Sequence, residues 1–185
     1  EPVAKKVLAE RVRARVGRHV RHAREVTVAV DRAGEVVLRD WVSQAAYLDD
    51  AAASEAVHRH GWYHTGDVGA VDAQGRITLL DRKKDVIITG GENVSSIEVE
   101  DAIFSHPQID EVAVIGVPDE KWGELVMALV VLAPGATLSE ADVIAYTRTK
   151  LAGYKCPKRV EFRSSLARTA TGKLQKFKLR EPYWL

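Results

Sequence analysis

Cysteine, methionine and long apolar runs are scarce in this chain of 185 residues. Cys156 is the only cysteine, so no intrachain disulfide can form, and we expect a reducing compartment. No apolar run approaches the roughly 20 residues that a membrane-spanning helix needs, and the N-terminal stretch has no apolar core of a signal peptide. These absences predict a cytoplasmic protein without a transmembrane segment.

The chain also lacks a strong charge imbalance. Its 27 Lys and Arg against 26 Asp and Glu give a formal net charge of +1 at pH 7, which argues against nucleic acid as a partner held by bulk electrostatics. The composition is 46% hydrophobic and 29% charged, which is typical of a soluble globular protein. The length fits one ordinary domain or two small ones.

Basic residues do concentrate over residues 1–24. Between them, apolar residues recur at spacings near three to four: Val3, Val7, Leu8, Val12, Val16 and Val20. This spacing predicts a basic amphipathic helix. Such a helix could bind an anionic membrane or RNA, but a solvated helix packed on a partner is the more common use of a charge run, and we leave its role unassigned.

Beyond this segment the pattern changes to that of strands. Alternation over residues 26–30 and an extended run over 35–39 predict a hairpin across a turn. Residues 51–60 are helical in composition, and residues 68–80 predict a second hairpin. We therefore expect a β-rich subdomain over residues 25–81.

Residues 86–185 predict a compact second domain. Ser95 and Glu98 have the spacing of a capping box at the start of a helix, and the apolar runs 112–117 and 125–132 are typical of buried strands. The remaining expected elements are a helix from Ser139 to about Lys150 with Asp142 at its third position, a strand over 159–162 and a last helix from Leu174. The predicted fold class is α+β, with a three-stranded sheet and flanking helices in this domain.

Two polar residues near the predicted boundary suit a nucleotide. Asp67 follows Thr65 and Gly66 just before a strand, where a carboxylate can accept hydrogen bonds from both hydroxyls of a ribose. Thr-Gly-Asp on its own is most often only a turn. Arg82 carries a planar, always charged guanidinium suited to ribose or phosphate oxygens, although an arginine in a basic run is commonly a solvated surface charge.

Two loops add further candidates. Gly90 and Gly91 follow an apolar strand, where glycines indicate either a turn or a backbone that a ligand approaches closely. Lys173 follows Gly172 in a polar loop, where a lysine is generally solvated surface. Neither loop is specific by itself.

Read together, residues 61–69, 81–93 and 168–175 closely resemble signature motifs of the adenylate-forming superfamily, and the chain looks like the C-terminal portion of an AMP-forming acyl-CoA synthetase. The resemblance covers about residues 34–184 and leaves out residues 1–24. It implies that a carboxylic acid and ATP, accompanied by Mg²⁺, give an acyl-adenylate and pyrophosphate. The thiol of coenzyme A then displaces AMP.

The resemblance also implies roles for four residues. Asp67 and Arg82 bind the nucleotide, Asp67 through the ribose of AMP. Lys84 is the hinge, within residues 82–85, about which a mobile domain over residues 86–185 rotates between the two steps. Lys173 is the catalytic residue, whose ammonium stabilises negative charge as pyrophosphate leaves.

A surface for coenzyme A is implied as well. Gly91 lines the tunnel for pantetheine, and Trp122, Tyr154 and Lys158 contact the remainder of the molecule through aromatic faces and a phosphate-binding charge. Lys155 is a further cation beside them. Two positions depart from the family pattern, since Cys156 stands where some relatives carry a basic residue and Ala167 where a proline is usual.

No segment resembles the family's Gly/Ser/Thr-rich phosphate loop or its acyl-binding pocket. We therefore expect an N-terminal adenylation domain to be missing from this sequence and the chain to be inactive alone. We expect no metal site within the chain. Its small-molecule partners are coenzyme A and a carboxylic acid, which general resemblance suggests is a fatty acid, with aromatic acids next.

Three alternatives stay open. A carrier-protein-loading adenylation domain shares the fold and motifs, although residues 90–93 resemble the acyl-CoA ligases better. A luciferase-like oxidative enzyme is expected to carry an additional lysine where Ile88 stands. A noncatalytic module that binds a nucleotide or coenzyme A would keep these motifs without the large domain.

Overall fold

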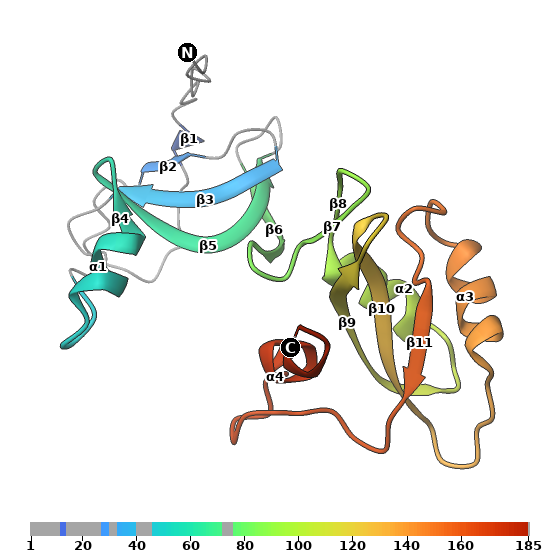
Figure 1. Ribbon diagram of the computed structural model, residues 1–185. Coiled ribbons are helices and arrows are strands. Elements are labelled where there is room, and N and C mark those ends of the chain that lie inside the picture. Colours follow the sequence, from blue (N-terminus) through green and yellow to red (C-terminus); the bar gives the residue numbers. More distant parts are fainter. Residues whose placement is uncertain (1–11, 14–26, 30–32, 40–45, 72–75, 185) are drawn as a thin grey trace. The chain divides into compact units, whose positions relative to one another are not determined.

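The computed structural model describes residues 12–13, 27–29, 33–39, 46–71 and 76–184 (Figure 1). The chain divides into two compact units, Glu1–Lys83 (unit 1) and Lys84–Leu185 (unit 2). The division falls inside the segment 82–85 for which the sequence predicts a hinge.

In its described residues, unit 1 is built on a six-stranded sheet. Its elements are β1 (Val12–Arg13), β2 (Thr27–Ala29), β3 (Ala33–Arg39), α1 (Ala51–Val57), β4 (His58–Arg59), β5 (Trp62–Val71) and β6 (Ile77–Arg82). The long strand β5 pairs with β3 along one edge and with β4 and β6 along the other, antiparallel in each case. Both predicted hairpins, β2–β3 and β5–β6, are confirmed.

The helix predicted for residues 1–24 is wrong at the two residues described there. Val12 and Arg13 form strand β1, antiparallel to Thr27 and Val28 of β2. A β-branched residue favours the extended backbone, and pairing with β2 satisfies the backbone polar groups. The rest of that segment lies outside the described residues.

Unit 2 contains a five-stranded sheet and helices. Its elements are β7 (Ile87–Thr89), β8 (Glu92–Val94), α2 (Ser96–Phe104), β9 (Ile109–Asp119), β10 (Gly123–Leu132), α3 (Glu140–Arg148), β11 (Arg159–Phe162), α4 (Lys176–Arg180) and the 3₁₀ helix η1 (Glu181–Tyr183). The central strand β10 is antiparallel to β9 and parallel to β11. The α+β class is confirmed, but the sheet has five strands rather than three, because the β7–β8 hairpin joins β10 through the single pair Thr89–Gly123.

Alternate residues of β9 and β10 serve two separate cores, because successive side chains of a strand point to opposite faces. One face packs on α2 and α3 through Val112, Val114, Val126, Ala128, Val130, Val99, Ile103 and Val143. The other face packs against the C-terminal segment through Ala113, Ile115, Met127, Leu129, Leu166, Leu174, Leu179 and Tyr183. Burial on both faces explains why these strands read as continuous apolar runs.

Side-chain caps fix the starts of the two longer helices. Ser95 accepts a hydrogen bond from the amide of Glu98 at 3.3 Å, and Ser139 and Asp142 form the complete reciprocal capping box. A cap of this kind satisfies amides that have no partner inside the helix. The predicted box is complete at the start of α3, whereas at α2 Ser95 caps the helix but the Glu98 carboxylate binds Lys155 instead of reaching back to the cap.

Candidate functional site

Asp67 and Arg82 lie opposite each other on β5 and β6. Arg82 Nε is 2.7 Å from Asp67 Oδ1, and the two side chains are 59% and 28% exposed, respectively. The fold thus brings together the two residues that the sequence predicts for nucleotide binding. Their carboxylate and guanidinium offer an acceptor and a donor side by side at the surface of unit 1, a combination that suits a sugar hydroxyl and a phosphate.

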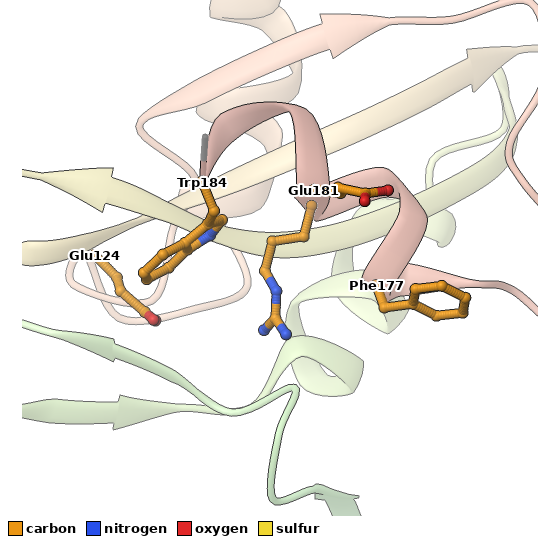
Figure 2. Close-up of a pocket in the computed structure, with 5 residues that line it drawn as sticks. Glu124, Phe177, Glu181 and Trp184 are labelled. Carbon is orange, nitrogen blue, oxygen red and sulfur yellow. The ribbon is translucent and has the colours of Figure 1, made fainter.

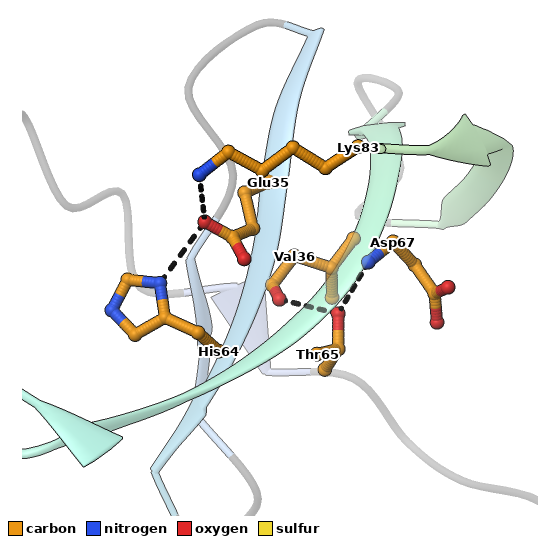
Figure 3. A network of polar contacts seen from close by, with 6 residues as sticks. All are labelled: Glu35, Val36, His64, Thr65, Asp67 and Lys83. Carbon is orange, nitrogen blue, oxygen red and sulfur yellow. Dashed lines mark hydrogen bonds and ion pairs between the residues drawn. The ribbon is translucent and has the colours of Figure 1, made fainter. Parts of the chain in front are cut away.

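A local turn of the backbone sets the position of Asp67. Gly66 has φ of +74°, a conformation that glycine adopts without steric cost, and its carbonyl accepts a hydrogen bond from the Lys83 amide at 2.8 Å. Thr65 Oγ1 donates to the Val36 carbonyl at 2.7 Å and accepts from the Asp67 amide at 3.1 Å. Figure 3 shows the Asp67 carboxylate pointing away from this network.

A charged cluster lies beside this turn (Figure 3). Glu35 Oε2 is 3.0 Å from His64 Nδ1 and 2.9 Å from Lys83 Nζ, and the Glu35 side chain is only 15% exposed. Burial raises the pKa of Glu35, but the contacts with His64 and Lys83 outweigh it and hold the pKa below its ordinary value. The cluster joins β3, β5 and the end of β6, and no sequence motif pointed to it.

Gly90 and Gly91 form the turn of the β7–β8 hairpin with φ of +59° and +85°. The Gly90 amide donates to the Trp122 carbonyl at 2.8 Å, and a Cβ added at Gly90 would lie 2.8 Å from the Trp122 ring. At Gly91 an added Cβ would meet nothing within 4 Å. The fold therefore places two predicted coenzyme A residues, Gly91 and Trp122, on one loop cluster, and Trp122 keeps 45% of its surface exposed.

Tyr154 and Lys158 lie in the segment before β11. Tyr154 is 46% exposed, and Lys158 Nζ donates to the Gly153 carbonyl at 3.3 Å. The ammonium of Lys155, the further cation expected beside them, donates to both carboxylate oxygens of Glu98 at 2.7 Å. That bond raises the pKa of Lys155 above its ordinary value, against the opposing effect of burial.

Cys156 is fully buried in this segment. Its thiol donates to the Leu151 and Ala152 carbonyls at 3.7 and 3.5 Å, and burial raises its pKa. A buried thiol with a raised pKa is a poor nucleophile. These contacts are those of a structural residue.

Lys173 lies in a loop whose backbone closes on itself. The Thr169 amide donates to the Lys173 carbonyl at 2.8 Å, the Gly172 amide donates to the Thr169 carbonyl at 2.9 Å, and Thr169 Oγ1 accepts from the Lys173 amide at 3.1 Å. Gly172 supplies φ of +84°. Lys173 itself is exposed, and no hydrogen bond or ion pair among the described residues engages its ammonium.

Arg168 fastens this loop to the sheet. Its guanidinium binds Glu111 of β9 through Nε at 3.0 Å and donates to the Gly172 carbonyl at 2.7 Å. A planar guanidinium with several fixed donors can bridge two such acceptors at once. The loop therefore has a defined shape, and the exposed ammonium of Lys173 projects from it.

The predicted site residues fall into two sets. Asp67 and Arg82 belong to unit 1, whereas Lys84 is the first residue of unit 2. Lys84 is exposed in a turn that precedes β7. The remaining predicted residues, all in unit 2, are Gly91, Trp122, Tyr154, Lys158 and Lys173.

A surface groove of about 410 Å³ in unit 2 was not predicted. It is lined by Glu124, Phe177, Arg180, Glu181 and Trp184, and Figure 2 shows Trp184 and Glu124 on one side of it and Phe177 on the other. Arg180 Nη1 also donates to the Lys84 carbonyl at 2.8 Å. These residues share no motif, and only folding brings Glu124 of β10 beside the C-terminal segment.

In the part of the chain that the structure describes, no three His, Cys, Asp or Glu residues converge as a metal-binding group. Carboxylate and imidazole clusters are what a protein-held divalent ion normally requires. None of the described helices is both long and apolar enough to cross a membrane.

The fold and these loops define a known class of domain. Residues 98–173 match the model of the family described as "AMP-binding enzyme C-terminal domain", and that match ends on Lys173. The resemblance of this chain to the C-terminal portion of adenylate-forming CoA ligases, which the motifs predicted, is thereby confirmed.

Individual relatives are consistent with that class. The long-chain-fatty-acid–CoA ligase FadD13 of Mycobacterium tuberculosis is 45% identical over 150 residues, which are 81% of this chain and 30% of FadD13. A 3-[(3aS,4S,7aS)-7a-methyl-1,5-dioxo-octahydro-1H-inden-4-yl]propanoyl:CoA ligase of the same organism is 48% identical over 158 residues, 85% of this chain and 31% of the ligase.

Solved structures show the same likeness. ATP-bound MatB from Rhodopseudomonas palustris superposes with a TM-score of 0.77 at 37% identity, and the likeness covers 85% of this chain and 31% of MatB. The chain thus spans about a third of the length of the proteins that it matches.

Proposed function

We propose that this chain is the C-terminal part of an ATP-dependent, AMP-forming acyl-CoA synthetase. The observation that carries the proposal is the Lys173 loop, in which the backbone is closed and anchored by Arg168 while the ammonium is exposed and unengaged among the described residues. A fixed loop with a lone cation suits the stabilisation of charge that develops on a transferring phosphoryl group.

In the first step, a carboxylate oxygen of the acid attacks the α-phosphorus of ATP, and the bond to the pyrophosphate leaving group breaks. Lys173 stabilises the negative charge on the carboxylate and the α-phosphate. Asp67 holds the ribose hydroxyls, and Arg82, already 2.7 Å from Asp67, contacts the same nucleotide. Mg²⁺ enters with ATP, and the phosphates supply its ligands.

In the second step, the thiol sulfur of coenzyme A attacks the acyl carbonyl and AMP leaves. Rotation about Lys84 withdraws Lys173 and presents the Gly91 loop. The open space at Gly91 and the exposed ring of Trp122 beside it suit a narrow path for pantetheine. Tyr154 and Lys158 contact the nucleotide end of coenzyme A.

The acid that we propose is a fatty acid. FadD13 is named as a long-chain-fatty-acid–CoA ligase, and this name supports the proposal. Because no segment of this chain resembles an acyl-binding pocket, the acid's identity is set outside it. We accordingly propose that the chain alone is inactive.

A hybrid enzyme tests the role of Lys173. The matched 150-residue part of FadD13 is replaced by the corresponding residues of this chain, and ATP–pyrophosphate exchange is measured with a long-chain fatty acid. We expect Lys173→Ala to slow exchange by about 100-fold or more, the magnitude typical of removing one transition-state stabiliser. Lys150→Ala, a change of another exposed lysine, should leave the rate unchanged.

Measuring the second half-reaction distinguishes a catalytic defect of the Lys173→Ala hybrid from a folding defect. When synthetic acyl-adenylate and coenzyme A are supplied, the Lys173→Ala hybrid should form acyl-CoA at nearly the rate of the unmodified hybrid. Equal losses in both half-reactions, or no loss in exchange, would contradict the assignment of Lys173 to the adenylation step.

A further inference from the structure

One ion pair ties the segment that holds Tyr154 and Lys158 to the first turn of α2. Lys155 Nζ donates to both carboxylate oxygens of Glu98 at 2.7 Å, and the two side chains are 23% and 42% exposed, respectively. The partners are 57 residues apart in the sequence. Lys155 lies between the two residues proposed to contact the nucleotide end of coenzyme A, whereas Glu98 follows the hairpin proposed for pantetheine.

Glu98 has a fixed position relative to that hairpin. Strand β8 ends at Val94, and α2 begins two residues later at Ser96, and both of these residues are fully buried. The Glu98 amide also donates to Ser95 Oγ at 3.3 Å. The Glu98 carboxylate therefore projects from a base that is joined rigidly to the Gly91 turn.

Burial holds only one half of the segment over residues 153–158, which we call the Tyr154 loop. Cys156 is fully buried, whereas the Tyr154 ring is exposed. The Lys155 ammonium lies 5.9 Å from the centroid of that ring, a distance at which a cation is attracted to an aromatic face. Lys155 thus contacts both the exposed ring and Glu98.

Coenzyme A is one molecule, so both of its ends bind together only if the two sets of contacts have a suitable spacing. The second contact of such a ligand is intramolecular, and its strength depends on that spacing. The ion pair runs from the helix that follows the Gly91 hairpin to the Tyr154 loop. It restricts the spacing before the ligand arrives, which reduces the entropy lost on binding.

We propose that Glu98 is a positioning residue that acts through Lys155 to hold the Tyr154 loop at the spacing that coenzyme A requires. The proposal rests on the coenzyme A contacts assigned in the proposed function. Glu98 itself touches no substrate. Its effect is confined to thiols that reach both the Gly91 hairpin and the Tyr154 loop.

Acyl transfer from synthetic acyl-adenylate to two thiols tests this role in the FadD13 hybrid. Coenzyme A carries the nucleotide end, whereas pantetheine carries only the arm that enters beside Gly91. We expect Glu98→Gln to raise the KM for coenzyme A by about fivefold, the upper range for a partly exposed ion pair, and the KM for pantetheine by much less. Asp101→Asn, which removes an exposed carboxylate from the same helix, should change neither KM.

The sign of the change separates positioning from a direct contact. If Lys155 itself bound a phosphate of coenzyme A, Glu98→Gln would free the ammonium, remove a repelling charge and lower the KM for coenzyme A. A lower or unchanged KM would therefore overturn the proposal. An equal rise for both thiols would overturn it too, because a general loss of structure has that effect.

A double variant tests whether Glu98 acts through Lys155. Lys155→Met should raise the KM for coenzyme A, and the addition of Glu98→Gln should cause no further rise, because the pair is already broken. Effects of the two single variants that multiply in the double variant would overturn the proposed route through Lys155.

Tyr154→Ala distinguishes a failure of this proposal from a failure of the proposed function. If Tyr154→Ala raises the KM for coenzyme A and Glu98→Gln does not, the coenzyme A contacts stand and only the positioning role falls. If neither Tyr154→Ala nor Lys158→Ala raises it, the contacts assigned in the proposed function are wrong, and the positioning role falls with them.

Discussion

The position of the Lys173 loop depends on contacts made by the residues before and after it. Arg168 binds Glu111 before it, and Lys176 binds Glu100 after it. Glu100 Oε1 also accepts a hydrogen bond from the Val114 amide at 2.7 Å. The nearly buried Lys176–Glu100 pair is the stronger anchor, because water screens it less than an exposed pair.

Removing one member of that pair should destabilise unit 2. Glu100→Gln leaves Lys176 without a counter-charge, and we expect a loss of about 2–3 kcal/mol in the free energy of unfolding, somewhat below the range for fully buried pairs. Urea unfolding followed by circular dichroism measures it. The double variant Glu100→Gln/Lys176→Met should recover part of the loss, and strictly additive losses would contradict the pairing.

Glu35 should contribute to stability in a pH-dependent way. Its folded-state pKa lies below its ordinary value of 4.5, so its contribution is fully present above that pH and is lost as the pH falls through the lower, folded value. Glu35→Gln should therefore destabilise unit 1 at pH 7 and flatten the decline of its stability below about pH 4.5. Melting curves between pH 3 and 7 test this, and an unaltered acid slope would refute it.

At the scale of elements, capping residues and apolar runs were sufficient to predict most of unit 2. Ser139 with Asp142 predicted the start of α3, and the strand predicted for residues 159–162 is β11. The same patterns missed the place of β7 and β8 in the sheet, because three-residue strands carry too few alternating positions. They also predicted a helix where Val12 and Arg13 pair with β2, a long-range contact that overrides local periodicity.

The β5–β6 hairpin, which carries Asp67 and Arg82, has no room for a side chain at Gly69. A Cβ there would lie 2.9 Å from the Thr78 carbonyl oxygen and 3.0 Å from Val36 Cγ2. The backbone of β6 cannot move away without breaking its pairing with β5. We therefore expect Gly69→Ala to lower the free energy of unfolding by about 1–3 kcal/mol. Thermal unfolding measures the cost, with Gly153→Ala, where an added Cβ meets nothing within 4 Å, as the control; equal melting points would contradict this account.

At the scale of the whole molecule, most residues of the candidate site were named from the sequence, and the structure shows where each of them lies. Asp67 and Arg82 form a pair, Gly91 and Trp122 share a loop cluster, and Lys173 is exposed on a closed loop. Their functions stay predictions. The groove around Arg180 could not be predicted, because its residues come from β10 and from the C-terminal segment and meet only through packing.

The division of the chain between Lys83 and Lys84 separates Asp67 and Arg82 from Lys173. If the proposed function holds, these two sets must meet on a nucleotide together with a phosphate loop, which no segment of this sequence resembles. Under the proposed function, the chain contributes residues to a site that it does not complete alone.

Acyl-CoA formation, followed by mass spectrometry, tests this account most directly. This chain alone and the FadD13 hybrid are each given ATP, Mg²⁺, coenzyme A and a long-chain fatty acid. We predict acyl-CoA from the hybrid, none from its Lys173→Ala variant and none from the chain alone. Product from the chain alone that Lys173→Ala abolishes, or no product from a folded hybrid, would contradict the account.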